Sequence, residues 1–173
     1  MKAYLIRHLP TEWNKKNLLQ GKKDISILNI SNEDKLQMEK NLQFINTQRF
    51  DKILTSTLKR TQQTANIYGY DAFQAEPLLD ELNFGIFEGL PKSKLIEGTN
   101  NFWIEDPKTL VLGESLQNFE DRLILFLSKY RRYKKILIFG HGAVIRALTS
   151  INNGKNIDSM NKIEIQNNSL TIL

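Results

Sequence analysis

The sequence contains only two histidines, and each follows a short apolar run that is typical of a buried strand. His8 comes directly after Arg7 and the run at residues 3–6, and His141 lies between two glycines after the run at 136–139. In open α/β folds, ligands gather at the carboxyl ends of the strands. One such histidine would more simply be structural, but two of them, one beside an arginine, favour a functional site.

Phosphoryl transfer without a metal is the chemistry that these residue types could perform. It requires a nucleophile, cations for the phosphate oxygens and an acid for the leaving group. His8 can supply a neutral ring nitrogen, and Arg7 and Arg60 can grip phosphate oxygens with a bidentate geometry that lysine lacks. Backbone amides after Gly142 would add partial positive charge at a helix start. Glu81 is a candidate acid, although its local sequence alone favours a solvated loop carboxylate.

The elements that must position these residues alternate between strand and helix, which predicts a layered α/β fold. Ser31 and Ser115 are predicted to cap two helices with apolar faces. Residues 9–31 and 76–90 are expected to be mainly loop, and residues 91–113 show no clear pattern. The remaining expectations are strands at residues 3–6, 53–54, 136–139 and 168–173, and helices over residues 57–68 and from 143 to 149.

The composition is that of one globular domain, with 173 residues of which 40% are hydrophobic and 25% charged. The absence of cysteine excludes disulfides, thiolate catalysis and cysteine metal sites, and two histidines argue against a histidine-rich metal site. The net charge is +5, but the lysines are scattered, so we expect no nucleic-acid binding. The first apolar stretch is broken at Arg7 and His8, and no run could span a membrane, which predicts a cytoplasmic protein.

Seven segments resemble the histidine phosphatase (phosphoglycerate mutase-like) superfamily, and they occur in that family's order. The stretch LIRHLPTEWN at residues 5–14 is similar to the family signature, which has Arg-His-Gly, an acidic or amide residue, Thr, a variable residue, Trp and Asn. One Arg-His pair would be weak evidence, but the ordered set covers nearly the whole chain. The other segments are LQGKKDISILN at 19–29, TSTLKRTQQTA at 55–65, LLDELNFGIFEGL at 78–90, GESLQNFEDR at 113–122, ILIFGHGAVIRAL at 136–148 and NNSLTIL at 167–173.

The resemblance implies a fold and an activity. The fold would be a three-layer α/β/α arrangement with a mostly parallel central sheet, formed by a single domain over residues 1–173. The activity would be that of the compact phosphatase branch, without a metal or an organic cofactor. The substrate would be a small phosphorylated metabolite of the sugar phosphate, phosphoglycerate or α-ribazole phosphate class. The protein could be a monomer or a homodimer, and we expect no membrane partner.

The resemblance also implies a role for each matching residue. His8 would form a phosphohistidine, and Glu81 would protonate the leaving oxygen and then deprotonate the attacking water. The phosphoryl group would be bound by four further polar residues: Arg7, Arg60, His141 and Asn14. Gly142 would offer its backbone N–H to the same group. Gln20 and Gly21, in the loop after the signature, would contact the substrate.

Two residues depart from the family signature. Leu9 replaces a glycine that could adopt a positive φ, so either that freedom is not required or the loop is reshaped. Pro10 has no N–H and removes one amide that could face the phosphate. Thr11 and Asn14 keep their places, which predicts a modified loop with a working site. A phosphoglycerate mutase and a non-catalytic phosphate-binding domain stay open as alternatives.

Overall fold

A five-stranded sheet forms the centre of the computed structural model, which describes residues 1–154 and 156–173. Its strand order is β3-β2-β4-β1-β5. All neighbouring strands are parallel except β5, which pairs antiparallel with β1. The prediction of a mostly parallel sheet is confirmed. The strands are β1 (Lys2–Arg7), β2 (Lys52–Thr55), β3 (Gln74–Ala75), β4 (Lys135–Gly140) and β5 (Leu170–Ile172).

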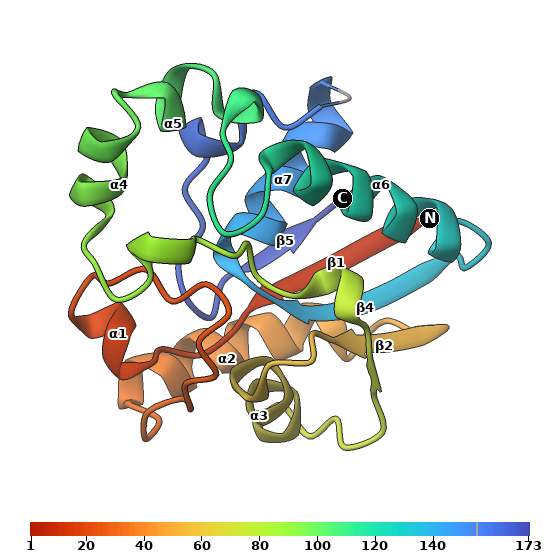
Figure 1. Cartoon of the computed structure of the whole chain (residues 1–173). Helices are drawn as coiled ribbons and strands as arrows, with labels where there is room; N and C mark the ends of the chain where they lie inside the picture. Colours follow the sequence, from red (N-terminus) through yellow and green to blue (C-terminus); the bar gives the residue numbers. More distant parts are fainter. Residues whose placement is uncertain (155) are drawn as a thin grey trace.

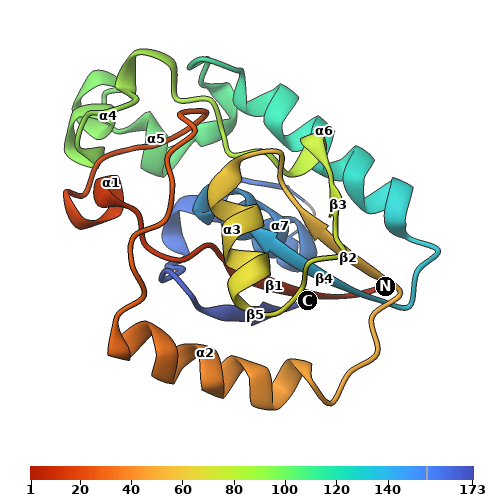
Figure 2. The ribbon, with the colours of Figure 1, turned by 90° about the horizontal axis from the view of Figure 1, so that it is seen from below.

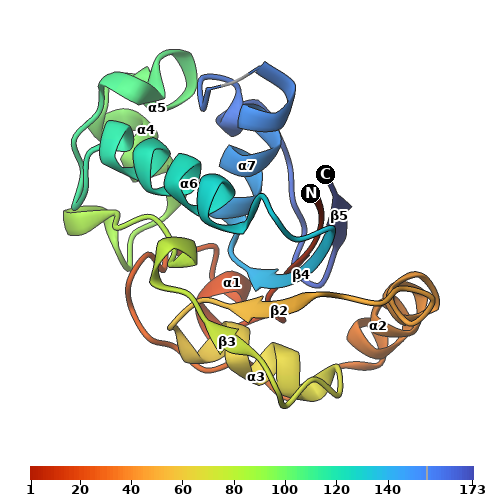
Figure 3. The same ribbon diagram turned by 90° about the vertical axis from the view of Figure 1, so that its right-hand side faces the viewer.

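Helices cover both faces of the sheet and complete the three expected layers (Figure 3). One face carries α2 (Asn32–Ile45) and α3 (Lys59–Ile67), and Figure 2 shows α3 lying over the strands from that side. The other face carries α6 (Leu116–Tyr130) and α7 (Gly142–Gly154). Smaller helices lie toward one end of the molecule (Figure 1): α1 (Glu12–Lys15), α4 (Lys92–Gly98) and α5 (Phe102–Glu105).

The buried core has two parts because successive side chains of a strand point to opposite faces of the sheet. Leu5 of β1 and Ile138 of β4 pack into the cluster under α6 and α7. Ile6 and Phe139, each the next residue along, pack into the cluster under α2 and α3. Burying each of these side chains contributes about 1.5–3 kcal/mol, so both faces hold the sheet in place.

The helix starts at Ser31 and Ser115 are confirmed. The Ser31 hydroxyl accepts a hydrogen bond from the backbone N–H of Asp34, whose carboxylate accepts one from the N–H of Ser31. The Ser115 hydroxyl accepts from the N–H of Asn118. Within the described residues, no helix combines the length and the apolar character that crossing a bilayer requires.

The sequence missed the short helices. The expected loop at residues 9–31 contains α1, the unpatterned stretch at 91–113 contains α4 and α5, and the expected loop at 76–90 contains two turns of 3₁₀ helix. Elements of three to seven residues are too short to show a hydrophobic period. The two turns in residues 76–90 are η1 (Pro77–Leu79) and η2 (Gly85–Phe87). Two further 3₁₀ turns are η3 (Pro107–Thr109) and η4 (Met160–Lys162).

The register of the three central strands brings their carboxyl ends to one edge of the sheet. Arg7 at the end of β1 is the partner of Gly140 at the end of β4, and Thr55 of β2 is the partner of Phe139. The residue that follows each strand is therefore placed at this edge, which brings His8 and His141 together with Ser56, the residue after β2.

Candidate active site

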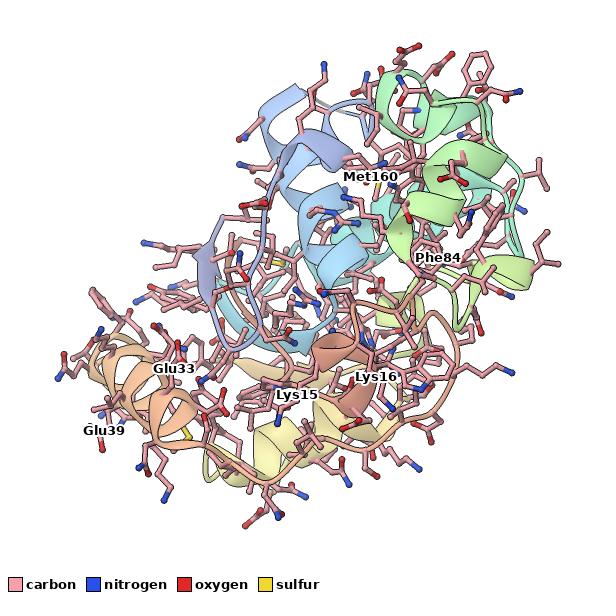
Figure 4. All side chains as sticks on the ribbon, turned by 90° about the vertical axis from the view of Figure 1, so that its left-hand side faces the viewer. Lys15, Lys16, Glu33, Glu39, Phe84 and Met160 are labelled. Carbon is pink, nitrogen blue, oxygen red and sulfur yellow. The ribbon has the colours of Figure 1, made fainter. Side chains whose placement is uncertain are left out.

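A small pocket of about 90 Å³ opens at this edge of the sheet. Figure 4 shows Phe84, one of its apolar lining residues, on the side of the molecule that carries α4 and α5, with Glu33 and Glu39 of α2 at the opposite end. His141 lies beside the pocket, fully buried, with its ring centroid 5.5 Å from that of His8. Seven residues predicted from the sequence line the pocket: Arg7, His8, Asn14, Gln20, Arg60, Glu81 and Gly142.

The ring of His8 carries its proton on Nδ1. This atom lies 2.7 Å from the carbonyl oxygen of Leu9, which can only accept a hydrogen bond. The neutral ring therefore has a free lone pair on Nε2, as a nucleophile requires. Burial, together with the positive charges of Arg60 and Arg7, holds the pKa of His8 well below its ordinary value of 6.5. The ring is consequently neutral at physiological pH.

His141 has the opposite tautomer. The Nε–H of Arg60 donates to Nδ1 of His141 at 3.2 Å, so in the neutral ring the proton is on Nε2. That Nε2 lies 2.7 Å from the hydroxyl oxygen of Ser56, the residue after β2. Burial and the charge of Arg60 lower the pKa of His141 well below 6.5, with smaller contributions from His8 and Arg7.

Arg60 is held by backbone carbonyls although it is fully buried. Its Nη1 donates to the carbonyl of Lys23 at 2.7 Å, and its Nη2 donates to that of Gly21 at 2.8 Å. A guanidinium has five N–H donors, so two remain for phosphate oxygens after the bond to His141 is counted. Gly21 was expected to contact substrate, but it is not among the residues that line the pocket and instead positions Arg60.

Arg7 lies against the first residue of α7. Its Nη1 donates to the carbonyl of Ile165 at 2.6 Å, and its buried Nε has no partner among the described residues. A Cβ on Gly142 would come 3.3 Å from this Nε, so a glycine allows the close approach. Burial lowers the pKa of Arg7 to about 10 against the opposing charge of Glu81, and the nearby Arg146 and Arg60 lower it further.

Glu81 is fixed above the start of α7. One carboxylate oxygen accepts from the backbone N–H of Leu82 at 3.0 Å, and the other accepts from that of Ala143 at 3.1 Å. The side chain is 8% exposed and lines the pocket, which overturns the reading of its local sequence as a solvated loop carboxylate. It shares the pocket with Arg7 and Arg60, and its charge acts on both guanidinium groups.

Asn14 presents its amide nitrogen to the pocket. Its Oδ1 accepts from the N–H and the hydroxyl of Thr11, both at 3.0 Å, and lies 3.4 Å from Nδ2 of Asn167. Since the oxygen is engaged, only the NH₂ group is available to a bound phosphate. Gln20 also lines the pocket, and its buried Oε1 has no partner within the described part of the chain.

Comparisons with known proteins show which family the chain belongs to. The model of the histidine phosphatase superfamily (branch 1) matches residues 3–173. The chain belongs to the histidine phosphatase superfamily. The prediction of an enzyme of the phosphatase class within this superfamily is confirmed.

Relatives of this histidine phosphatase cover most of its length. The uncharacterized phosphatase PhoE of Bacillus subtilis is 34% identical over 87% of this chain and 77% of its own. The α-ribazole phosphatase of Shigella flexneri is 26% identical with a TM-score of 0.78, covering 99% of this chain and 89% of that one. A mutant phosphoserine phosphatase of Entamoeba histolytica, solved with phosphoserine, is 25% identical with a TM-score of 0.75 and the same coverage.

The two departures from the signature are accommodated by the fold. Leu9 has a φ outside the left-handed region, its side chain is 1% exposed, and its N–H donates to the hydroxyl of Thr64 at 3.0 Å. The carbonyl of Pro10 accepts from the N–H of Leu28. The positive φ that a glycine would allow is therefore not required here, and the carbonyl of Leu9 still orients His8.

Sequence reasoning missed two residues of this histidine phosphatase site. Ser56 follows β2, and its position after a buried strand was the available signal. Arg146 lines the pocket one helical turn after Gly142 on α7, so the helical spacing could have placed it. Among the described residues, no group of three or more His, Cys, Asp or Glu side chains is arranged to hold a metal ion.

A wider surface groove of about 710 Å³ lies between α2 and residues 166–169. Its lining includes Glu33, Asp34 and Lys40, and among the described residues it contains no histidine or arginine. Its acidic side chains would repel a phosphate ester. The smaller pocket is therefore the one suited to phosphate chemistry.

Proposed function

We propose that this histidine phosphatase is a metal-independent phosphomonoesterase that acts on a small phosphorylated metabolite through a phosphohistidine on His8. The observation that carries the proposal is the tautomer of His8. Its hydrogen bond to the Leu9 carbonyl leaves Nε2 as a lone-pair donor in a pocket that also contains Arg7 and Arg60. A nucleophile beside two guanidinium groups suits attack on a phosphate ester.

The proposed reaction has two steps. In the first, Nε2 of His8 attacks phosphorus in line, the bond from phosphorus to the ester oxygen breaks, and Glu81 gives its proton to the leaving alcohol. In the second, Glu81 removes a proton from water, the water oxygen attacks phosphorus, and the bond to His8 breaks. Arg7, Arg60 and Asn14 stabilise the negative charge of the phosphoryl oxygens in both steps.

The names of relatives support a small phosphate ester as the substrate. One solved relative is named for α-ribazole phosphate and another was solved with phosphoserine. The pocket of about 90 Å³ favours an ester of this size over a phosphorylated protein side chain. The sugar phosphate, phosphoglycerate and α-ribazole phosphate classes are the starting panel.

Phosphate release from this panel, with a metal chelator present, tests the proposal. We expect turnover by the wild-type protein and a loss of more than about 10³-fold in His8→Ala, because the nucleophile is removed. Equal rates in both proteins would contradict the phosphohistidine. Interconversion of 2- and 3-phosphoglycerate would reveal a mutase, and binding of esters without turnover would reveal a phosphate-binding domain.

A further inference from the structure

Arg146 is a charged side chain in the pocket that the proposed reaction does not use. It projects from α7 one turn after Gly142 and lines the pocket. Its Nε is buried and has no hydrogen-bond partner within the described residues. None of the ion pairs formed by those residues includes Arg146. An unsatisfied buried donor destabilises the folded protein, so a ligand that accepts a hydrogen bond from it gains a favourable partner.

The surroundings of Arg146 are positively charged. Its charge lowers the pKa of Arg7, so the two guanidinium groups lie near each other. Lys92, the first residue of α4, has a pKa lowered by partial burial and then by Arg146, against the opposing charge of Glu164. Glu81 is the acid whose charge acts on Arg146, and its carboxylate already accepts two backbone hydrogen bonds.

The position of Glu81 shows which part of a substrate would meet Arg146. Glu81 accepts a hydrogen bond from the backbone N–H of Ala143, which lies three residues before Arg146 on α7. Residues three apart lie on the same face of a helix, so Glu81 lies against the face of α7 that carries Arg146. As the proposed proton donor, it faces the ester oxygen. Groups beyond that oxygen belong to the alcohol part of the substrate. We therefore place Arg146 next to the proposed proton donor, on the leaving-group side of the pocket.

We propose that Arg146, assisted by Lys92, forms a second anion subsite, and that the substrate is a small phosphate monoester whose alcohol part carries a second anionic group. This inference rests on the proposed function and specifies its substrate class. The planar fork of an arginine binds either a carboxylate or a phosphate with paired hydrogen bonds. Lys92 does not line the pocket itself, but it lies close enough to Arg146 for their charges to interact, so it adds positive charge beside the subsite.

Three esters of similar size test the subsite: 2-phosphoglycolate with a carboxylate, ethane-1,2-diol bisphosphate with a second phosphate, and 2-hydroxyethyl phosphate with a neutral hydroxyl. We expect the wild-type protein to show a kcat/KM at least about 10-fold higher for one of the anionic esters than for the neutral one. The anionic ester that is preferred identifies the group that Arg146 binds.

In Arg146→Gln, the preference for the anionic ester should fall by about 10- to 100-fold, the range of a charge-assisted hydrogen bond. Lys92→Gln should reduce it by about 3-fold, because an exposed charge is screened. The control is Arg131→Gln, which removes an exposed arginine just after α6, at the edge of the sheet away from the pocket. It should keep the wild-type preference.

Two results would overturn the inference. The first is equal hydrolysis of neutral and anionic esters by the wild-type protein, which leaves the phosphatase function standing. The second is an equal loss on all three esters in Arg146→Gln, which would show that Arg146 acts through Glu81. If Arg146→Gln unfolds, Arg146→Lys keeps the charge, loses the fork and should still reduce the preference.

Absence of turnover on every ester would contradict the proposed function while leaving the subsite testable. Titration calorimetry with the same three esters then measures binding. The subsite predicts that an anionic ester binds at least about 10-fold more tightly than the neutral one, and that Arg146→Gln removes this difference. Equal affinities in the wild-type protein would overturn the subsite.

Discussion

The two sides of the pocket differ in how their polar groups are held. On the side that would receive the phosphoryl group, Arg60 donates to His141 and to two carbonyls, and His8 is oriented by the carbonyl of Leu9. On the leaving-group side, Nε of Arg146 and Oε1 of Gln20 have no partner among the described residues. His8 and Arg60 are held in place before a ligand arrives, although the buried Nε of Arg7 has no partner among the described residues, whereas the side chain of Arg146 makes no hydrogen bond to those residues.

This difference separates reaction from recognition. Groups that stabilise developing charge are most effective when they are already oriented, because no reorganisation is then needed during the reaction. Groups that select among substrates gain most from atoms that only the right ligand satisfies. The contrast therefore predicts that changes on the first side reduce the rate for every ester, and changes at Arg146 alter the choice among esters.

The largest effect in this comparison should come from Arg60→Lys. A lysine has one ammonium group and cannot reach the carbonyls of Gly21 and Lys23 together with Nδ1 of His141. We expect kcat/KM to fall by about 10²–10³-fold on all esters, as when one preorganised donor is removed.

Steady-state kinetics on two unrelated esters measure this loss, and Arg131→Lys is the matched exposed control. The protein should also lose about 1–3 kcal/mol of unfolding free energy in urea for each buried carbonyl left without a partner. A loss of less than about 10-fold in kcat/KM would mean that the guanidinium fork is not needed for the phosphoryl group.

Glu81→Gln should have the next largest effect, and its size should depend on the leaving group. An amide cannot give a proton to the ester oxygen, so alkyl esters should slow by about 10²–10³-fold. Nitrophenyl phosphate, whose leaving group needs little protonation, should slow at least about 10-fold less. An equal loss on both esters would show that Glu81 positions the start of α7 through Ala143 and does not transfer a proton.

The sequence predicted the phosphoryl-binding side of the pocket far better than the leaving-group side. His8, Arg60 and His141 follow predicted strands or open a predicted helix within segments that resemble a known family, so their order placed them. Arg146 belongs to the same segment as His141, but the resemblance assigned it no role. Its helical spacing from Gly142 could have placed it in the pocket, but no local pattern indicates that its buried Nε has no partner among the described residues.

The fold likewise has elements that the sequence predicted and elements that it did not. The long helices and inner strands have enough residues to reveal a hydrophobic period or a buried run, so the layers and the parallel sheet were predictable. The helices α4 and α5 that form the end of the molecule near Phe84 are too short for such a pattern. Lys92 lies at the start of α4, so the wall that would contact the alcohol part of a substrate could not be derived from the sequence.

Ser56→Ala should have a smaller effect on the phosphoryl-binding side. The hydroxyl of Ser56 is the partner of Nε2 of His141, and removing it leaves this buried N–H unsatisfied. We expect kcat to fall about 10-fold, corresponding to about 1.4 kcal/mol. The nitrogen NMR signals of His141 should show the Nε2–H tautomer in the wild-type protein and a mixture in the variant. An unchanged tautomer would mean that Arg60 alone orients the ring.

The smallest effect should be a pH dependence of the free energy of unfolding that comes from the two buried histidines on the phosphoryl-binding side of the pocket. Both His8 and His141 have pKa values well below 6.5 because they are buried among positive charges. The unfolded chain therefore binds more protons than the folded one once the pH falls below 6.5. Their contribution to stability is complete above that value and is lost as the pH falls toward the pKa values of the folded protein.

Urea unfolding between about pH 7.5 and about pH 5.5 should show this loss, with a limiting slope of about 1.4 kcal/mol per pH unit for each histidine. Removing one ring in His8→Ala should roughly halve the slope. Arg146→Gln should leave it unchanged, because an arginine stays charged throughout this range. An unfolding free energy that stays constant down to about pH 5.5 would contradict buried neutral histidines, and with them the lone pair that the proposed nucleophile requires.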